Sequence, residues 1–505
     1  MNTLRLFRPI AVVIAMIGST ALAADAPPRT FRIGSKVFTE SVILGEIGRG
    51  LVADAGLKAI HRKELGGSQI LFHALEADQL DAYPEYTGTI AAEILGLKGA
   101  DARDEARIRA GLAARGIGMS RPLGFDNTYA IGMRAEPADR LAIATISDLA
   151  RHPELRFGFG NEFMDRADGW PGLRAAYGLP QNSVRGLDHD LAYRALASDE
   201  IDATELYSTD AEIRKYGLKI LRDDRGFFPS YRSVWLYRTD LAPAALAALA
   251  RLEGKIDEPT MTAMNARAKL DGASEPRVAA DFLASRFGIA ADVASTGFAR
   301  RLLNRLGEHL VLVITSLAAA IAAAIPLGVL AARRPKLGRW ILAGAGVLQT
   351  IPSLALLVFL IPQLGIGAKP VLVALFLYSL LPIVRNTATG LRDVPASLVE
   401  SAEALGLSSW ARLRLVELPM ASRSILGGIK TAAVINVGTA TIGALIGAGG
   451  FGQPIFTGLR RDDTAMILYE GAIPAAVLAL VVQAGFDLSE RWLVPRGLRE
   501  ATPGA

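Results

Sequence analysis

From Leu310 to Ala332 the sequence runs without a charged side chain. Because about 20 consecutive apolar residues suffice for a helix to cross a bilayer, this run predicts a membrane span. Further candidate spans follow at Trp340–Ile361, Pro370–Val384, Thr431–Ala448 and Gly471–Phe486. We therefore predict an all-α polytopic domain over residues 308–495, with about five spans.

The region that precedes this domain has a different composition. Short apolar runs that end in glycine, such as Phe31–Gly34 and Arg156–Gly160, predict strands. Helical patterns such as Ser41–Ala53 and Ser68–Gln79 lie between them. This alternation favours an α/β fold that receives ligands at the carboxyl ends of its strands. Residues 240–286, rich in Ala, Leu and Arg, are expected to be helical throughout.

The domain organisation follows from these two compositions. We predict a two-lobed α/β domain at 28–288, with its second lobe at about 127–232. A basic amphipathic linker at 289–307 then leads into the membrane domain.

The N-terminus has the layout of a secretory signal peptide. Arg5 and Arg8 precede an apolar run, and a small-residue cleavage site ends at Ala23. We expect residues 1–23 to be this signal, and an uncleaved anchor helix is the alternative. Both place the α/β domain outside the cytoplasm, in the periplasm or the extracellular space.

The basic residues predict the same orientation for the membrane domain. They concentrate in the first and third loops and near the C-terminus, which places these segments and the 496–505 tail in the cytoplasm. Arg460 and Arg461 lie in an external loop and oppose the rule, although Asp462 and Asp463 follow them. The prediction is a multi-pass protein of the plasma (inner) membrane, in contact with lipid.

Composition and motifs also exclude several functions. With 55 basic and 50 acidic side chains, the net charge of +5 gives no basic footprint for nucleic acid. The absence of cysteine excludes disulfides and thiolate metal sites. The five histidines lack metal-ligand spacing, and neither a nucleophile elbow nor a phosphate-binding G-x4-G-K-[ST] loop occurs. We expect no catalysis, no metal and no cofactor in this chain.

The third loop carries the most specific motif of the membrane domain. Glu400-Ser401-Ala402, then Gly406, then Val416-Glu417-Leu418-Pro419 resembles the coupling motif of ABC importer permeases, with its spacing preserved. The resemblance implies two short helices that dock on a separate ATPase subunit, which binds ATP and Mg²⁺. We expect the glycine to allow a tight turn between these helices and the proline to stop the second one. An amphipathic pair of surface helices is the alternative.

Polar residues inside the predicted spans have two interpretations. Such groups are unfavourable in hydrocarbon, and Asn436 is the clearest example. It could line a solute path or form a hydrogen bond between helices, and the two are equally compatible with the sequence.

Four tyrosines of the α/β domain lie beside turn residues rather than in apolar stripes. They are Tyr86, Tyr129, Tyr207 and Tyr231. Tyrosines in loops at strand ends suggest a binding cleft, although packing or a surface role explains any one of them alone.

Their contexts together resemble the binding proteins of ABC importers for osmoprotectants, which are glycine betaine, choline and carnitine. The matching segments are Lys36–Glu40, Tyr83–Thr89, Asn127–Tyr129, Asp165–Gly169 and Tyr207–Asp210. The resemblance implies that the four tyrosines form a cage around a quaternary ammonium. It also implies that Lys36, Arg166 and Thr89 hold a carboxylate, and that Asn127 stands beside the cage where some relatives have an acidic residue.

The chemistry of these side chains is consistent with that assignment. An ammonium without N–H groups is selected by aromatic faces, at about 0.5–2 kcal/mol per contact. A carboxylate prefers charge-assisted donors such as lysine and arginine. A zwitterion therefore matches better than plain choline. Glu85 and Asp168 are interpreted as structural carboxylates that cap or pair with Arg166 nearby.

These observations predict a fused substrate-binding and permease subunit of an osmoprotectant ABC importer, with glycine betaine as the expected solute. The resemblance further implies a type II-like periplasmic-binding-protein build for the α/β domain and a homodimer of the permease half. Two alternatives remain open: an importer of the same build for another small zwitterion, such as an ectoine or an amino-acid derivative, and a ligand-gated channel or sensor.

Overall fold

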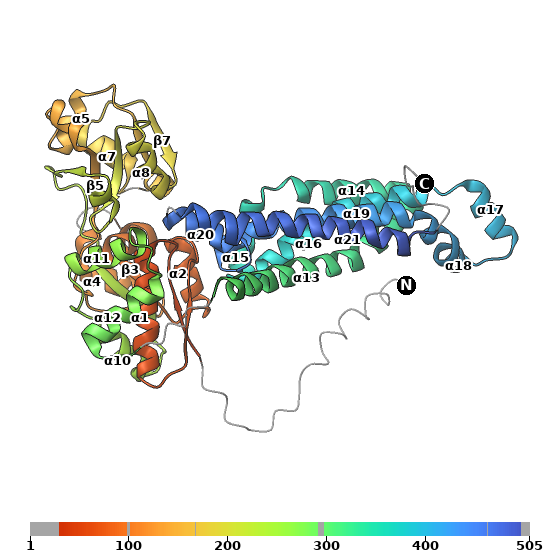
Figure 1. Cartoon of the computed structure of the whole chain (residues 1–505), viewed down its shortest axis with the longest axis horizontal. Coiled ribbons are helices and arrows are strands. Elements are labelled where there is room, and N and C mark those ends of the chain that lie inside the picture. Colours follow the sequence, from red (N-terminus) through yellow and green to blue (C-terminus); the bar gives the residue numbers. More distant parts are fainter. Residues whose placement is uncertain (1–29, 98–100, 167, 291–296, 462, 496–505) are drawn as a thin grey trace.

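The computed structural model describes residues 30–97, 101–166, 168–290, 297–461 and 463–495. The predicted signal peptide and the 496–505 tail lie outside these residues. Two α/β lobes stand at one end of an elongated bundle of helices (Figure 1). The predicted fold class, a two-lobed α/β domain followed by an all-α domain, is confirmed.

The first lobe is built on a five-stranded sheet of order β2-β1-β3-β10-β4. β1 is parallel to β2 and β3, whereas β10 runs antiparallel to β3 and β4. The strands are β1 (Phe31–Gly34), β2 (Ala59–Arg62), β3 (Ala82–Tyr86), β4 (Ile117–Met119) and β10 (Ser233–Arg238).

Helices of this lobe come from both ends of the domain sequence, because α10, α11 and α12 return to pack against α1. The prediction of helix throughout 240–286 is confirmed only in part, because the chain leaves the helical conformation between α10 and α11 and again between α11 and α12. The helical elements are α1 (Thr39–Asp54), α2 (Ser68–Glu76), α3 (Thr87–Thr89), η1 (Ile90–Ile94), η2 (Asp101–Arg103), α4 (Glu105–Ala113), α10 (Pro243–Ala250), α11 (Glu258–Lys269) and α12 (Glu275–Phe287).

The second lobe repeats this plan with a sheet of order β7-β6-β8-β5-β9, in which β5 is antiparallel to its two neighbours. Its strands are β5 (Tyr129–Arg134), β6 (Phe157–Gly160), β7 (Val184–Leu187), β8 (Ala203–Tyr207) and β9 (Leu218–Leu221). Its helices are α5 (Ala135–Arg140), η3 (Ile146–Arg151), α6 (Asn161–Asp165), α7 (Trp170–Tyr177), α8 (His189–Ala197) and α9 (Glu212–Lys215).

The chain crosses between the lobes twice, just before β5 and just before β10. The two crossing segments pair with each other through a β-bridge between Asp126 and Arg232. In addition, the Tyr231 N–H donates to Asp126 Oδ1 at 2.7 Å. Two adjacent connections of this kind form a natural hinge for lobe motion.

In the described part of the membrane half, residues 297–461 and 463–495, four helices are long and apolar enough to cross a bilayer, and a bent pair of helices raises the number of candidate spans to five if it counts as one span. That pair is α14 (Pro335–Thr350) and α15 (Ser353–Leu364), which meet at 96° where Pro352 interrupts the predicted second span. The other elements are α13 (Phe298–Arg333), α16 (Ala368–Arg392), α17 (Ala396–Ala404), α18 (Ser409–Arg412), η4 (Leu413–Glu417), α19 (Leu418–Ala440), η5 (Thr441–Ile446), α20 (Gly452–Arg461), η6 (Met466–Ala472) and α21 (Ile473–Leu493).

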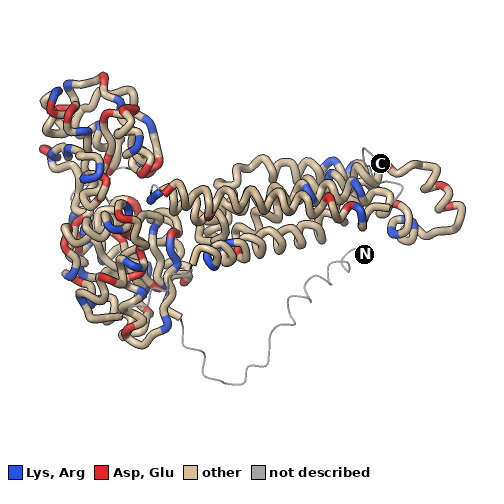
Figure 2. The backbone as a smooth tube through the Cα atoms, viewed as in Figure 1, with Lys and Arg blue, Asp and Glu red and all other residues tan. Residues whose placement is uncertain are grey.

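Charge is distributed unevenly along the bundle. Figure 2 shows charged residues on the lobes and at the two ends of the bundle, whereas its middle is almost free of them. An uncharged middle section is what hydrocarbon requires of a polytopic protein.

The third-loop prediction is partly wrong. Gly406, at φ +76°, does make the turn between α17 and α18, as expected. Pro419 does not stop the second helix, because it lies in the first turn of α19, after the wide turn of η4. A proline is tolerated there, since the first N–H groups of a helix need no partner within that helix.

The first lobe packs directly on the bundle. One apolar cluster contains lobe residues such as Leu65 and Leu71 together with Val371 and Phe451 of the membrane half. Gln79 adds a hydrogen bond across this junction, since its Oε1 accepts from the Ile366 N–H at 2.8 Å. The two halves of the chain therefore share a core.

Candidate functional site

A cavity of about 280 Å³ lies between the two lobes. Side chains from β3, β5, β8 and both crossing segments converge on it. All eight residues predicted to bind ligand line this cavity: Lys36, Tyr86, Thr89, Asn127, Tyr129, Arg166, Tyr207 and Tyr231. Strand ends position most of them, which is why turn-associated tyrosines in the sequence located this site. Their role in ligand binding stays a prediction.

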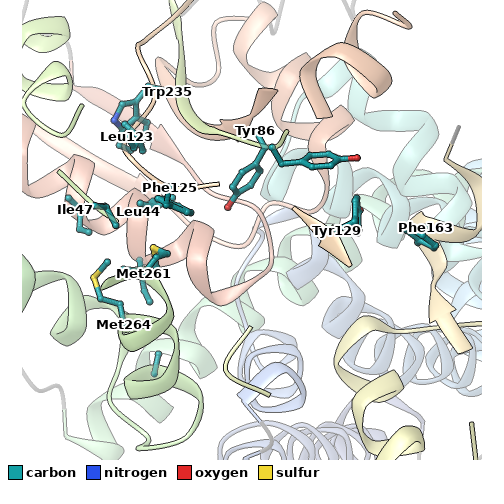
Figure 3. Packing of buried hydrophobic residues seen from close by; sticks show 14 of the residues in the cluster. Leu44, Ile47, Tyr86, Leu123, Phe125, Tyr129, Phe163, Trp235, Met261 and Met264 are labelled. Atoms are coloured by element: carbon teal, nitrogen blue, oxygen red, sulfur yellow. The ribbon is translucent and has the colours of Figure 1, made fainter. Parts of the chain in front are cut away.

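The aromatic rings form a continuous wall. Tyr129 lies 5.0 Å from Tyr207 and 5.2 Å from Tyr231 between ring centroids, and the second pair meets edge to face. Phe38 joins the wall by stacking on both Tyr86 and Tyr207, at 6.2 Å from each. Figure 3 shows Tyr86, Tyr129 and Phe163 at one side of the buried cluster, away from Leu44 and Ile47.

Two of these rings already face a cation of the protein. The Lys36 ammonium lies 5.1 Å from the Tyr86 centroid, and the Arg166 guanidinium lies 5.5 Å from that of Tyr129. These contacts demonstrate that the ring faces are accessible to a positive charge in this arrangement.

Both predicted carboxylate-binding cations have an acidic partner within the protein. Lys36 forms an ion pair with Glu85. Arg166 uses Nε and Nη2 on the two oxygens of Asp168, at 2.8 and 2.6 Å. The interpretation of Asp168 as a structural carboxylate is confirmed, and Tyr231 Oη also donates to it at 2.6 Å. The pairs neutralise the local charge of both cations.

Glu40 is a central residue of the site that sequence reasoning missed. It is 3% exposed and accepts hydrogen bonds from Tyr86, Asn127, Thr209 and Asn265. Thr209 belongs to the second lobe and Asn265 to α11 of the first, so this one carboxyl group links the lobes. Burial raises the pKa of Glu40, and the hydrogen bonds from Thr209, Tyr86 and Asn265 offset part of that effect.

A second group of charges on the cavity wall surrounds His189. Burial lowers its pKa, but hydrogen bonds to Asp210 and Glu205 outweigh burial and raise the pKa well above 6.5. The ring nitrogens lie 2.9 Å from Glu205 Oε1 and 3.1 Å from Asp210 Oδ2. Both ring nitrogens of His189 thus face a carboxyl group, and the ring lies 4.6 Å from the Tyr207 ring between centroids.

Other cavity residues were also missed: Phe38, Glu162, Asn265, Lys269 and Arg460. Phe38 and Glu40 belong to the segment that carried the family resemblance, so that segment was a usable signal. Asn265 and Lys269 lie on α11, whose alanine-rich sequence gives no such signal.

The membrane half places its own predicted residues far from this cavity. Figure 1 shows α17, which carries Glu400–Ala402 of the coupling motif, and the following helix α18 at the end of the bundle opposite the lobes. Within the bundle, Asn436 Nδ2 donates to Ser316 at 3.2 Å and to Ser379 at 2.9 Å. Asn436 thus forms hydrogen bonds between helices, one of the two interpretations that its sequence context allowed.

Two known families match this chain, one over the α/β domain and one over the membrane half. Residues 29–285 match the family described as the substrate-binding domain of the ABC-type glycine betaine transport system. Residues 324–498 match the inner membrane component of binding-protein-dependent transport systems.

Individual relatives match the membrane half. The carnitine transport permease protein OpuCB of Listeria monocytogenes is 42% identical over 203 residues, which are 40% of this chain and 93% of the relative. The glycine betaine/carnitine/choline permease OpuCB of Bacillus subtilis is 41% identical over 198 residues, 39% of this chain and 91% of the relative. A crystal structure described as a glycine betaine/carnitine/choline ABC transporter covers 50% of this chain and 98% of its own, at 29% identity and a TM-score of 0.44.

The fold, the two family matches and the permease relatives define a membrane transport subunit in which a receptor domain and a permease are one chain. The chain belongs to the family of ABC-type glycine betaine substrate-binding domains, and its second half belongs to the binding-protein-dependent permeases. The relatives are transport permeases rather than enzymes.

Proposed function

We propose that this chain is the substrate-binding and permease subunit of an ABC importer for quaternary-ammonium osmoprotectants, with glycine betaine as its main solute. The observation that carries the proposal is the set of four tyrosines around one cavity between two lobes. An aromatic wall selects a cation that has no N–H groups, because hydrogen-bond acceptors cannot recognise it.

The polar side of the cavity suits the carboxylate of glycine betaine. Arg166 engages Asp168 through Nε and Nη2, so the Nη1 donors remain for a ligand oxygen. Lys36 likewise has N–H groups beyond the one that its pair with Glu85 requires. The carboxylate is then held by hydrogen bonds to cations whose charge is already balanced.

The same balance supports choline as a second candidate. With Lys36 and Arg166 neutralised by Glu85 and Asp168, the wall does not repel a ligand of net charge +1. Choline needs the aromatic wall but not the donors of Arg166 and Lys36.

The membrane half implies partners. A separate ATPase subunit, which binds ATP and Mg²⁺, docks on α17 and α18 in this proposal, and two copies of the permease half enclose the path. In this proposal the lobes are external, and the coupling loop, at the opposite end of the bundle, is cytoplasmic. Lipid surrounds the uncharged middle section.

The proposal is tested by calorimetric titration of the full chain in lipid nanodiscs with glycine betaine, choline and carnitine. We expect glycine betaine to bind tightly and choline to bind more weakly. If choline binds more tightly than glycine betaine, choline becomes the main solute in place of glycine betaine. No heat with any of the three would refute the proposal.

A further inference from the structure

Arg460 belongs to the membrane half of the chain but lines the ligand cavity of the α/β domain. It lies in the last turn of α20, at the end of the bundle nearest the lobes (Figure 1). Its guanidinium forms an ion pair with Glu64, and the two side chains are 11% and 6% exposed. A residue that lies 229 positions after Tyr231, the last tyrosine of the cage, thus completes the cavity wall.

Glu64 is held tightly in place by α20. Thr457 Oγ1 donates to Glu64 Oε1 at 3.0 Å, and Gln453 Nε2 donates to Glu64 Oε2 at 3.3 Å. The backbone of Glu64 has φ +63°, a conformation that is unfavourable for a residue other than glycine. Such strain persists only where surrounding contacts enforce it, and it concentrates at functional sites.

The end of α20 contacts both lobes. Arg461 pairs with Glu275 at 3.1 Å and donates to the Ala273 carbonyl at 2.6 Å, both in the first lobe. Arg194 of the second lobe donates to the Leu459 carbonyl at 2.9 Å. Any change in the angle between the lobes therefore alters the contacts of α20.

These contacts also account for the two arginines that opposed the positive-inside rule. Arg460 and Arg461 each have a buried carboxylate partner on the α/β domain. The charges of this loop are thus balanced by the receptor that it contacts.

We propose that Arg460 is an affinity-determining residue of the ligand cavity, contributed by the permease, and that its pairing with Glu64 couples the binding of a cationic ligand to the contact between receptor and permease. The inference rests on the proposed function. The Arg460–Glu64 ion pair has no net charge and does not repel a cationic ligand. An Arg460 guanidinium without this partner would repel an ammonium group in the same cavity. Because coupling is reciprocal, ligand in the cavity also changes the strength of the α20 contact.

The test uses the full chain in lipid nanodiscs, titrated with choline. Glu64→Gln leaves the guanidinium unpaired, and we expect the choline affinity to fall about threefold to tenfold. Arg460→Gln removes the cation and leaves the Glu64 carboxylate unpaired, so the affinity for choline should rise. The choline affinity of the double variant should return toward that of the wild type, and a double-mutant cycle gives the coupling energy between the two residues. A purely structural contact would weaken binding in both single variants.

Two controls isolate the charge effect. Arg461→Gln removes a buried ion pair from the same helix at a residue that does not line the cavity, so it controls for the loss of a lobe contact, and its choline affinity should fall less than that of Glu64→Gln. Glycine betaine has no net charge, so its affinity should shift less than that of choline in the Glu64→Gln variant.

Equal losses in both single variants, or no change beyond twofold in either, would overturn this inference while leaving the proposed function intact. A wild-type chain that binds neither choline nor glycine betaine would overturn both.

Discussion

Tyr207 is the cage residue best suited to a test at the scale of single residues, because it is only half-buried. Its ring stacks on Phe38 and tilts against Tyr129, and its hydroxyl lies 3.4 Å from the Tyr129 hydroxyl. The ring face, rather than the hydroxyl, is the feature that an ammonium requires.

Replacing Tyr207 by Leu should therefore weaken glycine betaine binding by about 2-fold to 30-fold, as expected for the loss of one cation–π contact. Tyr207→Phe keeps the ring and should bind within about twofold of wild type. Isothermal titration of the full chain measures both. A Leu variant that binds as tightly as the Phe variant would exclude this ring from the cage.

The sequence located some of these residues and not others for a physical reason. Tyr86 and Tyr207 each end a strand, one in the sheet of each lobe, and open α/β sheets receive ligands at the carboxyl ends of their strands. Glu40 and Asn265 are 225 positions apart, and their hydrogen bond exists because α11 folds back on the first lobe. Arg460 reaches the cavity through the packing of one domain on another. Local patterns contain no information on such long-range contacts.

At the scale of elements, α1 is tied to β2 and β1 through one buried polar group. Glu46 on α1 contacts His61 of β2 at 3.0 Å, and the other ring nitrogen of His61 lies 2.8 Å from Ser35 Oγ. Burial raises the pKa of Glu46, but His61 and Arg49 outweigh burial and lower the pKa to about 2.

A carboxyl group whose pKa is lower in the folded state stabilises the fold above its unfolded pKa, and this contribution disappears as the pH falls. For Glu46 the loss should extend from about pH 4.5 down to about pH 2 and amount to about 3 kcal/mol. Glu46→Gln should unfold more easily at neutral pH and show a weaker decline in acid. Urea unfolding of both chains across this pH range measures the difference. Parallel pH profiles would contradict the role of Glu46.

The coupling segment depends on the turn between α17 and α18. Gly406 has φ +76°, and no other atom lies within 4 Å of the position that a Cβ would occupy. Space is therefore available, and only the backbone conformation restricts the residue. Asparagine tolerates this left-handed conformation, whereas a β-branched residue does not.

Gly406→Val should accordingly abolish most ATP-driven uptake in proteoliposomes that contain the ATPase, while Gly406→Asn keeps it. Ligand affinity should be the same in both variants, because this turn and the cavity lie at opposite ends of the bundle. Uptake by the Val variant at the wild-type rate would argue against the coupling assignment. Loss of ligand binding in that variant would argue against the separation of the two sites.

At the scale of the whole molecule, the receptor and the permease are joined by a shared apolar core as well as by ion pairs. Leu65 of the first lobe is 2% exposed and packs on Gly447, where an added Cβ would come within 2.5 Å of Leu65 Cδ2. Apolar burial is insensitive to salt screening, in contrast to exposed ion pairs. The junction should therefore persist at high ionic strength as long as this core is intact.

Leu65→Asp should separate the halves, because it removes a buried leucine, which costs about 2–5 kcal/mol, and adds an unpaired carboxylate. The chain has no cysteine, so spin labels at Ala77→Cys and Thr464→Cys report the distance between lobe and bundle without further substitutions. We expect one narrow distance distribution in the parent chain, at low and high salt, and a broad one with Leu65→Asp.

Ile60→Asp is the matched control, since Ile60 is 39% exposed on β2 of the same lobe and should leave the distribution narrow. A narrow distribution with Leu65→Asp would mean that ion pairs such as Glu64–Arg460 hold the halves together without the apolar core, and the distribution should then broaden at high salt.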